Sequence, residues 1–130
     1  MDSKKRKEIE IKTKKIINSF KYAIDGIFTS LKYERNMKIH FFIMILVIVA
    51  GFLLKISTLE WIICIALFAA VFSAELFNTA IENLVDIVIP YKHEKAKVVK
   101  DVSAGAVLVW AIGAATIGVI IFTPKIIELF

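Results

Sequence analysis

The chain is 130 residues long, the length of a single domain, and 58% of its residues are hydrophobic. Soluble domains usually carry about 45–50% apolar residues, so this composition excludes an ordinary soluble globule and a disordered chain. The single cysteine, Cys64, excludes an internal disulfide framework and a cysteine-based zinc site, and its apolar surroundings make it a packing residue. The net charge of +5 suits nucleic acid or an anionic membrane, and the mean hydropathy of +0.75 favours the membrane over nucleic acid.

The first segment of the chain is basic and then amphipathic. Residues 1–38 carry 11 of the 17 lysines and arginines, without the apolar core of a cleavable signal peptide. Apolar residues recur at three- and four-residue steps from Ile16 to Leu31, which predicts an amphipathic helix over about residues 9–34. Because this helix precedes a hydrophobic span, we expect it to lie in the cytoplasmic membrane interface; a helix that packs only on protein is the alternative.

Hydrophobic segments long enough to cross a bilayer follow at about residues 36–55, 57–88 and 98–123. The third contains an uncharged run from Val102 to Pro124, and a bilayer needs only about 20 apolar residues. The second contains glutamates, but a helix over 57–75 rises roughly 27 Å, which matches the hydrocarbon core. Pro90 should end this helix, since proline disfavours helical geometry in the preceding residue. The sequence therefore predicts an all-α membrane protein with three transmembrane helices.

The distribution of lysine and arginine predicts the orientation. The link from 87 to 101 carries four lysines, whereas the link from 55 to 60 and the tail after the last span carry one each. The positive-inside rule then places the N-terminus and the 87–101 link in the cytoplasm and the C-terminus outside.

The most informative stretch is SAELFNTAIENLVD, residues 73–86. At about 100° per residue, one narrow helix face collects Glu75, Asn78, Glu82 and Asp86. Ionisable groups within membrane segments are costly and usually face a bundle interior or a wet cavity. We therefore expect a functional site here; the alternative is an exposed helix end whose carboxylates are simply solvated.

Other polar residues reach the same cytoplasmic level from neighbouring segments: Glu34, His93, Glu94, Lys100 and Asp101. Carboxylates with room for water suit Mg²⁺, which takes oxygen ligands and often bridges to phosphates, and a nearby lysine suits a phosphate. The sequence contains neither GxxxxGK[ST] nor GxGxxG, so a nucleotide would be held by metal and side chains rather than by a phosphate-binding loop.

The run AELFNTAIENLVD, followed by KHE and then KDVSAGAVL, closely resembles the prokaryotic integral-membrane diacylglycerol kinase family. The preceding KYERNMKIH is similar to its Gram-positive branch, whose members act as undecaprenol kinases. The resemblance covers the chain from about Lys15 to its end. It implies three transmembrane helices preceded by a surface helix, a homotrimer with active sites shared between subunits, and transfer of the ATP γ-phosphate to a lipid alcohol with Mg²⁺.

The resemblance also implies roles for individual residues. Glu75 matches the family's proposed catalytic base, and Glu34 and Glu82 match its Mg²⁺ ligands. Asn78 matches a polar residue that lies between Glu75 and Glu82 on the same helix. Asp86 lies on the same helix face and is expected to support the site. Besides the two metal ligands, the positions near the nucleotide are matched by Lys15, Tyr22, His93, Lys100 and Asp101.

Ala104 departs from the pattern of some diacylglycerol-preferring members, which have serine at this position near the lipid hydroxyl. This departure and the KYERNMKIH segment favour undecaprenol as the acceptor, with diacylglycerol as the alternative. A second alternative is a non-catalytic membrane scaffold or a cation transporter. A conduit would need polar groups through the full depth of the spans, whose outer halves lack them.

Overall fold

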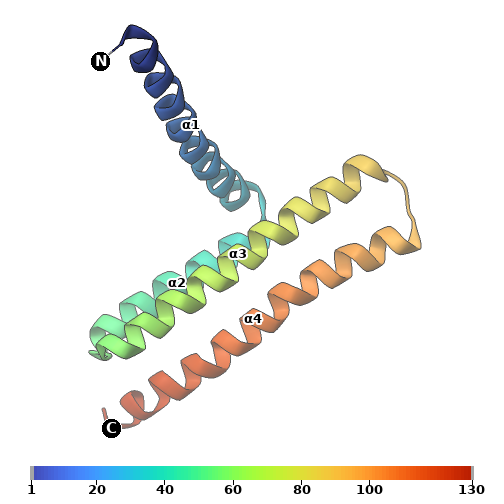
Figure 1. Ribbon diagram of the computed structural model, residues 1–130. Coiled ribbons are helices and arrows are strands. Elements are labelled where there is room, and N and C mark those ends of the chain that lie inside the picture. The colour runs from blue at the N-terminus through green and yellow to red at the C-terminus, as the bar shows by residue number, and fades with distance from the viewer. Residues whose placement is uncertain (1, 130) are drawn as a thin grey trace. The chain divides into compact units, whose positions relative to one another are not determined.

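The computed structural model describes residues 2–129, which form helices joined by short connections (Figure 1). The helices in chain order are α1 (Ser3–Tyr33), α2 (Arg35–Leu53), α3 (Thr58–Val88) and α4 (Glu94–Ile127). α1 forms one compact unit, and α2 to α4 form another. The all-α prediction is confirmed for this part of the chain, and α2, α3 and α4 are each long and apolar enough to cross a membrane.

α1 is a single helix with most of its surface exposed. It begins at Ser3 rather than near residue 9, because the lysine- and glutamate-rich start favours helix, and Glu8 and Lys12 form an exposed ion pair of 3.0 Å one turn apart. Its apolar stripe is uncovered; Phe20 and Phe28 are 68% and 66% exposed. Its position at a membrane surface stays a prediction.

The second unit is an antiparallel arrangement in which α3 packs against both α2 and α4 (Figure 1). At most 17% of the apolar window in each of these helices is buried, so most of the hydrophobic surface faces outward. Soluble proteins rarely expose contiguous apolar surface on this scale, whereas lipid covers it without cost. The outward apolar surface and the satisfied helical backbone together fit a membrane-embedded unit.

α3 and α4 meet along narrow seams whose buried residues repeat at three-, four- and seven-residue steps, as in coiled-coil packing. On α3 the seam contains Cys64, Val71, Glu75 and Asn78, and on α4 it contains Ala96, Ser103, Val107 and Ile121. Cys64 is 4% exposed and packs with Ile56 and Ile121, as expected of a packing residue. The α3 seam is therefore apolar in its first half and polar in its second.

The connection from α2 to α3 is a tight turn that brings two helices close together. Ser57 begins α3 with a capping box, in which its hydroxyl accepts from the Glu60 amide and the Glu60 carboxylate accepts from the Ser57 amide at 2.6 Å. Glu60 also pairs with Lys125 at 3.2 Å, which ties the end of α4 to the start of α3. The turn joins α2 to α3, and the ion pair holds α4 against them at this end.

The other helix ends follow from local chemistry. α3 ends at Val88, two residues before Pro90, as the effect of proline on its predecessor predicts. α4 begins at Glu94, four residues earlier than the predicted span, because His93 caps it by accepting from the Lys95 amide at 3.2 Å. α4 also continues through Pro124 to Ile127, so this proline lies within the last turns of the helix.

Gly51 is buried on α2, close to the Trp61 side chain of α3. A methyl group added at Gly51 would lie 2.7 Å from the Trp61 ring and 3.0 Å from Ile56. We predict that Gly51→Ala lowers the free energy of unfolding by about 1–3 kcal/mol, since overpacking forces ring and helix apart. Thermal unfolding in detergent micelles measures the effect. Gly113→Ala is the control, because a methyl group there meets nothing within 4 Å; equal destabilisation by both substitutions would contradict the close-packing account.

Candidate functional site

The polar half of the α3 seam places carboxylate and amide groups inside the helix arrangement. Glu75 is 2% exposed and Asn78 is 6% exposed, although both lie on a helix that is long and apolar enough to span a membrane. The predicted face thus points inward at these two positions rather than to solvent. This excludes a merely solvated helix end for Glu75 and Asn78.

Asn78 connects α3 to α4 through a buried hydrogen bond. The Ser103 hydroxyl donates to the Asn78 side-chain oxygen at 2.6 Å, and the Lys100 carbonyl oxygen is a second acceptor for the same hydroxyl at 2.9 Å. The Asn78 amide in turn donates to Oε1 of Glu82 at 3.3 Å. The amide therefore fixes the Glu82 carboxylate relative to α4, because its own oxygen is held from the opposite side.

Glu75 receives its closest charged contact from α2. Nε2 of His40 lies 3.1 Å from Oε1 of Glu75, within ion-pair distance. The geometry is not aligned for a hydrogen bond, so Oε1 is buried without a hydrogen-bond donor within the described residues. Glu75 therefore presents a buried, under-satisfied oxygen beside the His40 imidazole.

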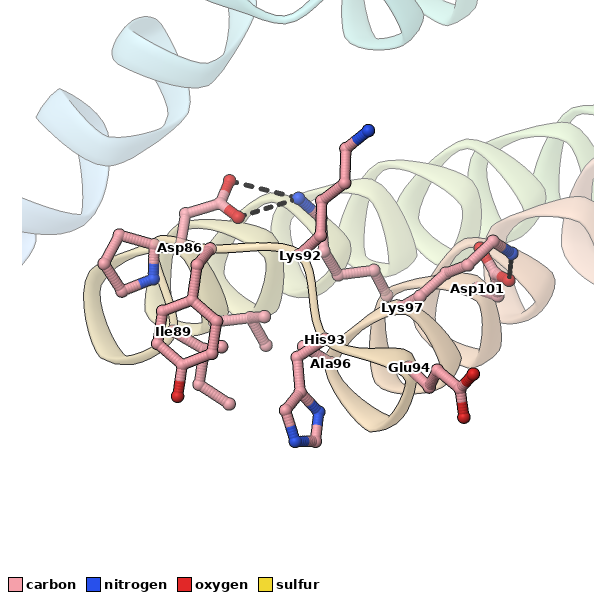
Figure 2. A pocket seen from close by; sticks show the side chains of 12 residues that line it. Asp86, Ile89, Lys92, His93, Glu94, Ala96, Lys97 and Asp101 are labelled. Carbon is pink, nitrogen blue, oxygen red and sulfur yellow. Dashed lines mark hydrogen bonds and ion pairs between the residues drawn. The ribbon is translucent and has the colours of Figure 1, made fainter.

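An open pocket of about 630 Å³ lies where α3 turns into α4 (Figure 2). Asp86 closes one side by accepting from Nζ of Lys100 at 2.9 and 3.1 Å, and a second ion pair joins Lys97 to Asp101. Two further cationic or polar side chains from the connection, Lys92 and His93, also line it. The pocket is open to solvent, and its three lysines are matched by the carboxylates of Asp86, Glu94 and Asp101, so an anion would have to replace a carboxylate as the partner of a lysine.

An apolar groove of about 470 Å³ runs between α2, α3 and α4. Hydrophobic side chains such as Met44, Phe68 and Ile117 line it, and His40 also lines it. Along α4 the groove extends from residue 111 to residue 126, about 22 Å at 1.5 Å per residue. His40 thus contacts both the apolar groove and the Glu75 carboxylate.

The structure brings most of the predicted residues together within the α2–α4 unit. Glu75 and Asn78 are buried and Glu82 beside them is partly buried, while the pocket contains Asp86, His93, Lys100 and Asp101. Ala104 is exposed on α4, outside the hydrogen-bonded network that its neighbour Ser103 enters. Lys15 and Tyr22 are exposed on α1, in the other unit.

Sequence reasoning missed three residues of this site: His40, Ser103 and Lys97. His40 carried a usable signal, since an ionisable residue inside a hydrophobic span is a functional candidate by default. Ser103 and Lys97 carried none, because a serine and a lysine near a helix start are ordinary residues until their partners are known.

The carboxylates at this site suit a hard cation. Glu34 precedes α2 without using its side chain as a helix cap, and Glu82 has one oxygen left outside its bond to Asn78. Within residues 2–129, no three His, Cys, Asp or Glu side chains are grouped closely enough to hold a metal ion by themselves. Mg²⁺ usually takes only one or two carboxylates and completes its shell with phosphates and water, so the two glutamates fit such an ion.

Comparison with known proteins identifies the family. The model of the prokaryotic diacylglycerol kinase family matches residues 21–122. The chain belongs to this family. An undecaprenol kinase of Bacillus subtilis is 40% identical over 126 residues, which cover 97% of this chain and all of that protein.

Diacylglycerol kinases are also among its relatives. The Synechocystis protein is 36% identical, over 88% of this chain and 66% of its own length, and the Haemophilus influenzae protein is 30% identical, over 72% and 80%. The resemblance seen in the α3 motif is therefore confirmed, and it holds over nearly the whole chain.

The Ser103–Asn78 hydrogen bond gives a stability prediction. Ser103→Ala leaves the buried Asn78 oxygen without its donor, which should lower the free energy of unfolding by about 1–3 kcal/mol. Thr116→Val is the control, because the Thr116 hydroxyl bonds only the Ile112 carbonyl of its own helix and is exposed. Thermal unfolding in the same micelles should separate the two variants; equal midpoints would show that the bond contributes nothing.

Proposed function

We propose that the protein is a lipid kinase that transfers the γ-phosphate of ATP to the hydroxyl of a polyprenol, undecaprenol in particular, at the cytoplasmic membrane interface. The observation that carries the proposal is the Glu75 carboxylate, 2% exposed, with an oxygen that lacks a hydrogen-bond donor in the described residues. A lipid hydroxyl is such a donor. The full-length similarity to an undecaprenol kinase supports the choice of acceptor.

The apolar groove gives the lipid a path to this carboxylate. A single prenyl chain lying along α4 would leave its hydroxyl beside His40, the lining residue that contacts Glu75. The lipid tail then stays in hydrocarbon while only the head group reaches the polar face. This arrangement explains how so small an enzyme could act on its substrate without removing it from the bilayer.

The chemistry assigned to Glu75 is general base catalysis. Its carboxylate accepts the proton of the alcohol, the alcohol oxygen forms a bond to the γ-phosphorus, and the bond from that phosphorus to the β–γ bridging oxygen breaks to release ADP. Phosphoryl transfer needs alignment and charge neutralisation more than covalent participation by the protein. A rigid position for Glu75 on α3 supplies the alignment.

The nucleotide side of the site is assigned to the α3–α4 pocket and the acidic groups beside it. Glu34 and Glu82 would hold Mg²⁺, which neutralises phosphate charge when bound. Lys100 would exchange its contact with Asp86 for a phosphate, with His93 and Asp101 in the same pocket. The family resemblance alone also assigns Lys15 and Tyr22 to the nucleotide.

The proposal includes a homotrimer in the bacterial inner membrane, with the N-terminus in the cytoplasm, the C-terminus outside and α1 as an amphipathic helix on the surface. The lysine-rich α3–α4 connection supports this orientation. Residues 2–129 of one chain contain no group of three His, Cys, Asp or Glu side chains that could hold a metal, and most of the apolar surface of α2, α3 and α4 is uncovered. Both observations favour an assembly in which neighbouring subunits contribute to each site.

Diacylglycerol is the alternative acceptor, which the names of two relatives favour. A scaffold or cation transporter is less consistent with the charge distribution, because the buried charge lies in one half of the α3 seam. The outer half of that seam is apolar, with Cys64 and Val71.

The acceptor is tested by comparing alcohols in the same mixed micelles. With γ-labelled ATP and purified protein, we expect kcat/KM for undecaprenol to exceed that for diacylglycerol by at least about tenfold, which corresponds to about 1.4 kcal/mol of transition-state binding. The reverse preference would move the assignment to diacylglycerol kinase, and transfer to neither alcohol would refute the proposed function.

The roles of two glutamates are tested with isosteric substitutions. Glu75→Gln removes the proton acceptor and should lower kcat by about 10²–10⁴-fold, with little change in the concentration of Mg²⁺ required. Glu82→Gln weakens the metal site, so excess Mg²⁺ should restore part of its activity by mass action and none of the activity of Glu75→Gln. A Mg²⁺ titration of initial rates compares them; rescue of Glu75→Gln instead would reverse the two roles.

A further inference from the structure

His40 occupies a position that the proposed mechanism leaves without a role. It lies on α2, its side chain is 19% exposed, and its Nε2 atom is 3.1 Å from Oε1 of Glu75. The same side chain lines the apolar groove. His40 is therefore placed between the path assigned to the lipid and the carboxylate assigned as base.

Glu75 needs a positive partner, because a carboxylate buried among apolar side chains is strongly disfavoured without one. Glu34 and Glu82 add negative charge to its surroundings, and α4 contributes only the neutral Ser103 hydroxyl to the network through Asn78. Among residues 2–129, His40 is the basic side chain within 4.0 Å of Glu75. Lys100 is engaged with Asp86 instead.

We infer that His40 is a positioning residue for Glu75: the contact between its Nε2 atom and Oε1 holds the carboxylate where it can accept the alcohol proton. The inference rests on the proposed function of Glu75 as base. His40 acts through Glu75 and does not itself take the proton from the alcohol. Because His40 lies on α2, that helix must pack against α3 for the Glu75 carboxylate to be held in position.

A double-mutant cycle tests this role, using His40→Gln, Glu75→Gln and the double variant in the phosphoryl-transfer assay. We expect His40→Gln to lower kcat by about 10- to 100-fold with the KM for Mg²⁺–ATP unchanged, and to change kcat less than about twofold when Glu75 is already Gln. If His40→Gln lowers kcat equally in both backgrounds, His40 acts independently of Glu75, for example as the base itself, and the inference is overturned.

Thermal unfolding midpoints of the same four proteins test the contact without any turnover. His40→Gln should lower the midpoint more when Glu75 is present than when it is Gln, because only the first background loses an ion pair. Additive shifts would overturn the contact. A failure of the proposed function would look different: the wild-type protein would phosphorylate none of the alcohols while the coupling in stability persisted.

Matched variants separate this role from general damage to α2. His40→Asn, a smaller replacement, should show the same dependence on Glu75, so the conclusion does not rely on one variant folding well. Ile39→Gln introduces the same amide at the adjacent residue, which is 49% exposed, and should lower kcat equally in both Glu75 backgrounds if it lowers kcat at all. Coupling of Ile39→Gln to Glu75 as strong as that of His40→Gln would contradict a specific role for His40.

Discussion

The burial of one carboxylate constrains the rest of this structure. Glu75 is 2% exposed on a helix whose length and composition suit a membrane, where an unpaired charge is among the most expensive groups to accommodate. The surrounding helices must therefore supply a counter-charge and exclude lipid from that position. The His40 contact from α2 and the packing of α4 along the same seam meet these two requirements.

The α3–α4 pair provides the frame that keeps the polar groups in register. A buried hydrogen bond from Ser103 to Asn78 and an ion pair from Lys100 to Asp86 join the helices in their polar half. At the opposite end, Lys125 pairs with Glu60. Glu75 and Glu82 lie two turns apart on α3 itself, and the contacts at both ends hold that helix against α4.

The helices and the polar face could be predicted from the sequence because both depend on local periodicity. A 3.6-residue repeat places Glu75 and Asn78 on one side of α3 whatever lies opposite, and Pro90 ends that helix by its own geometry. The partners of that face could not be predicted, because His40 lies 35 residues from Glu75, Ser103 lies 25 residues from Asn78, and each pair meets only through helix packing. The metal roles of Glu34 and Glu82 rest on the family resemblance alone.

The most direct test of this account is to move the Glu75 carboxylate without removing its charge. Glu75→Asp keeps an ionised group on α3 but withdraws it by one methylene from α2 and from the lipid groove. Single-turnover transfer from γ-labelled ATP to undecaprenol should slow by about 100-fold, the usual cost of a misplacement of about 1 Å, with the KM for Mg²⁺–ATP little changed. Transfer at the wild-type rate would contradict the account, because it would show that the position of this carboxylate does not matter.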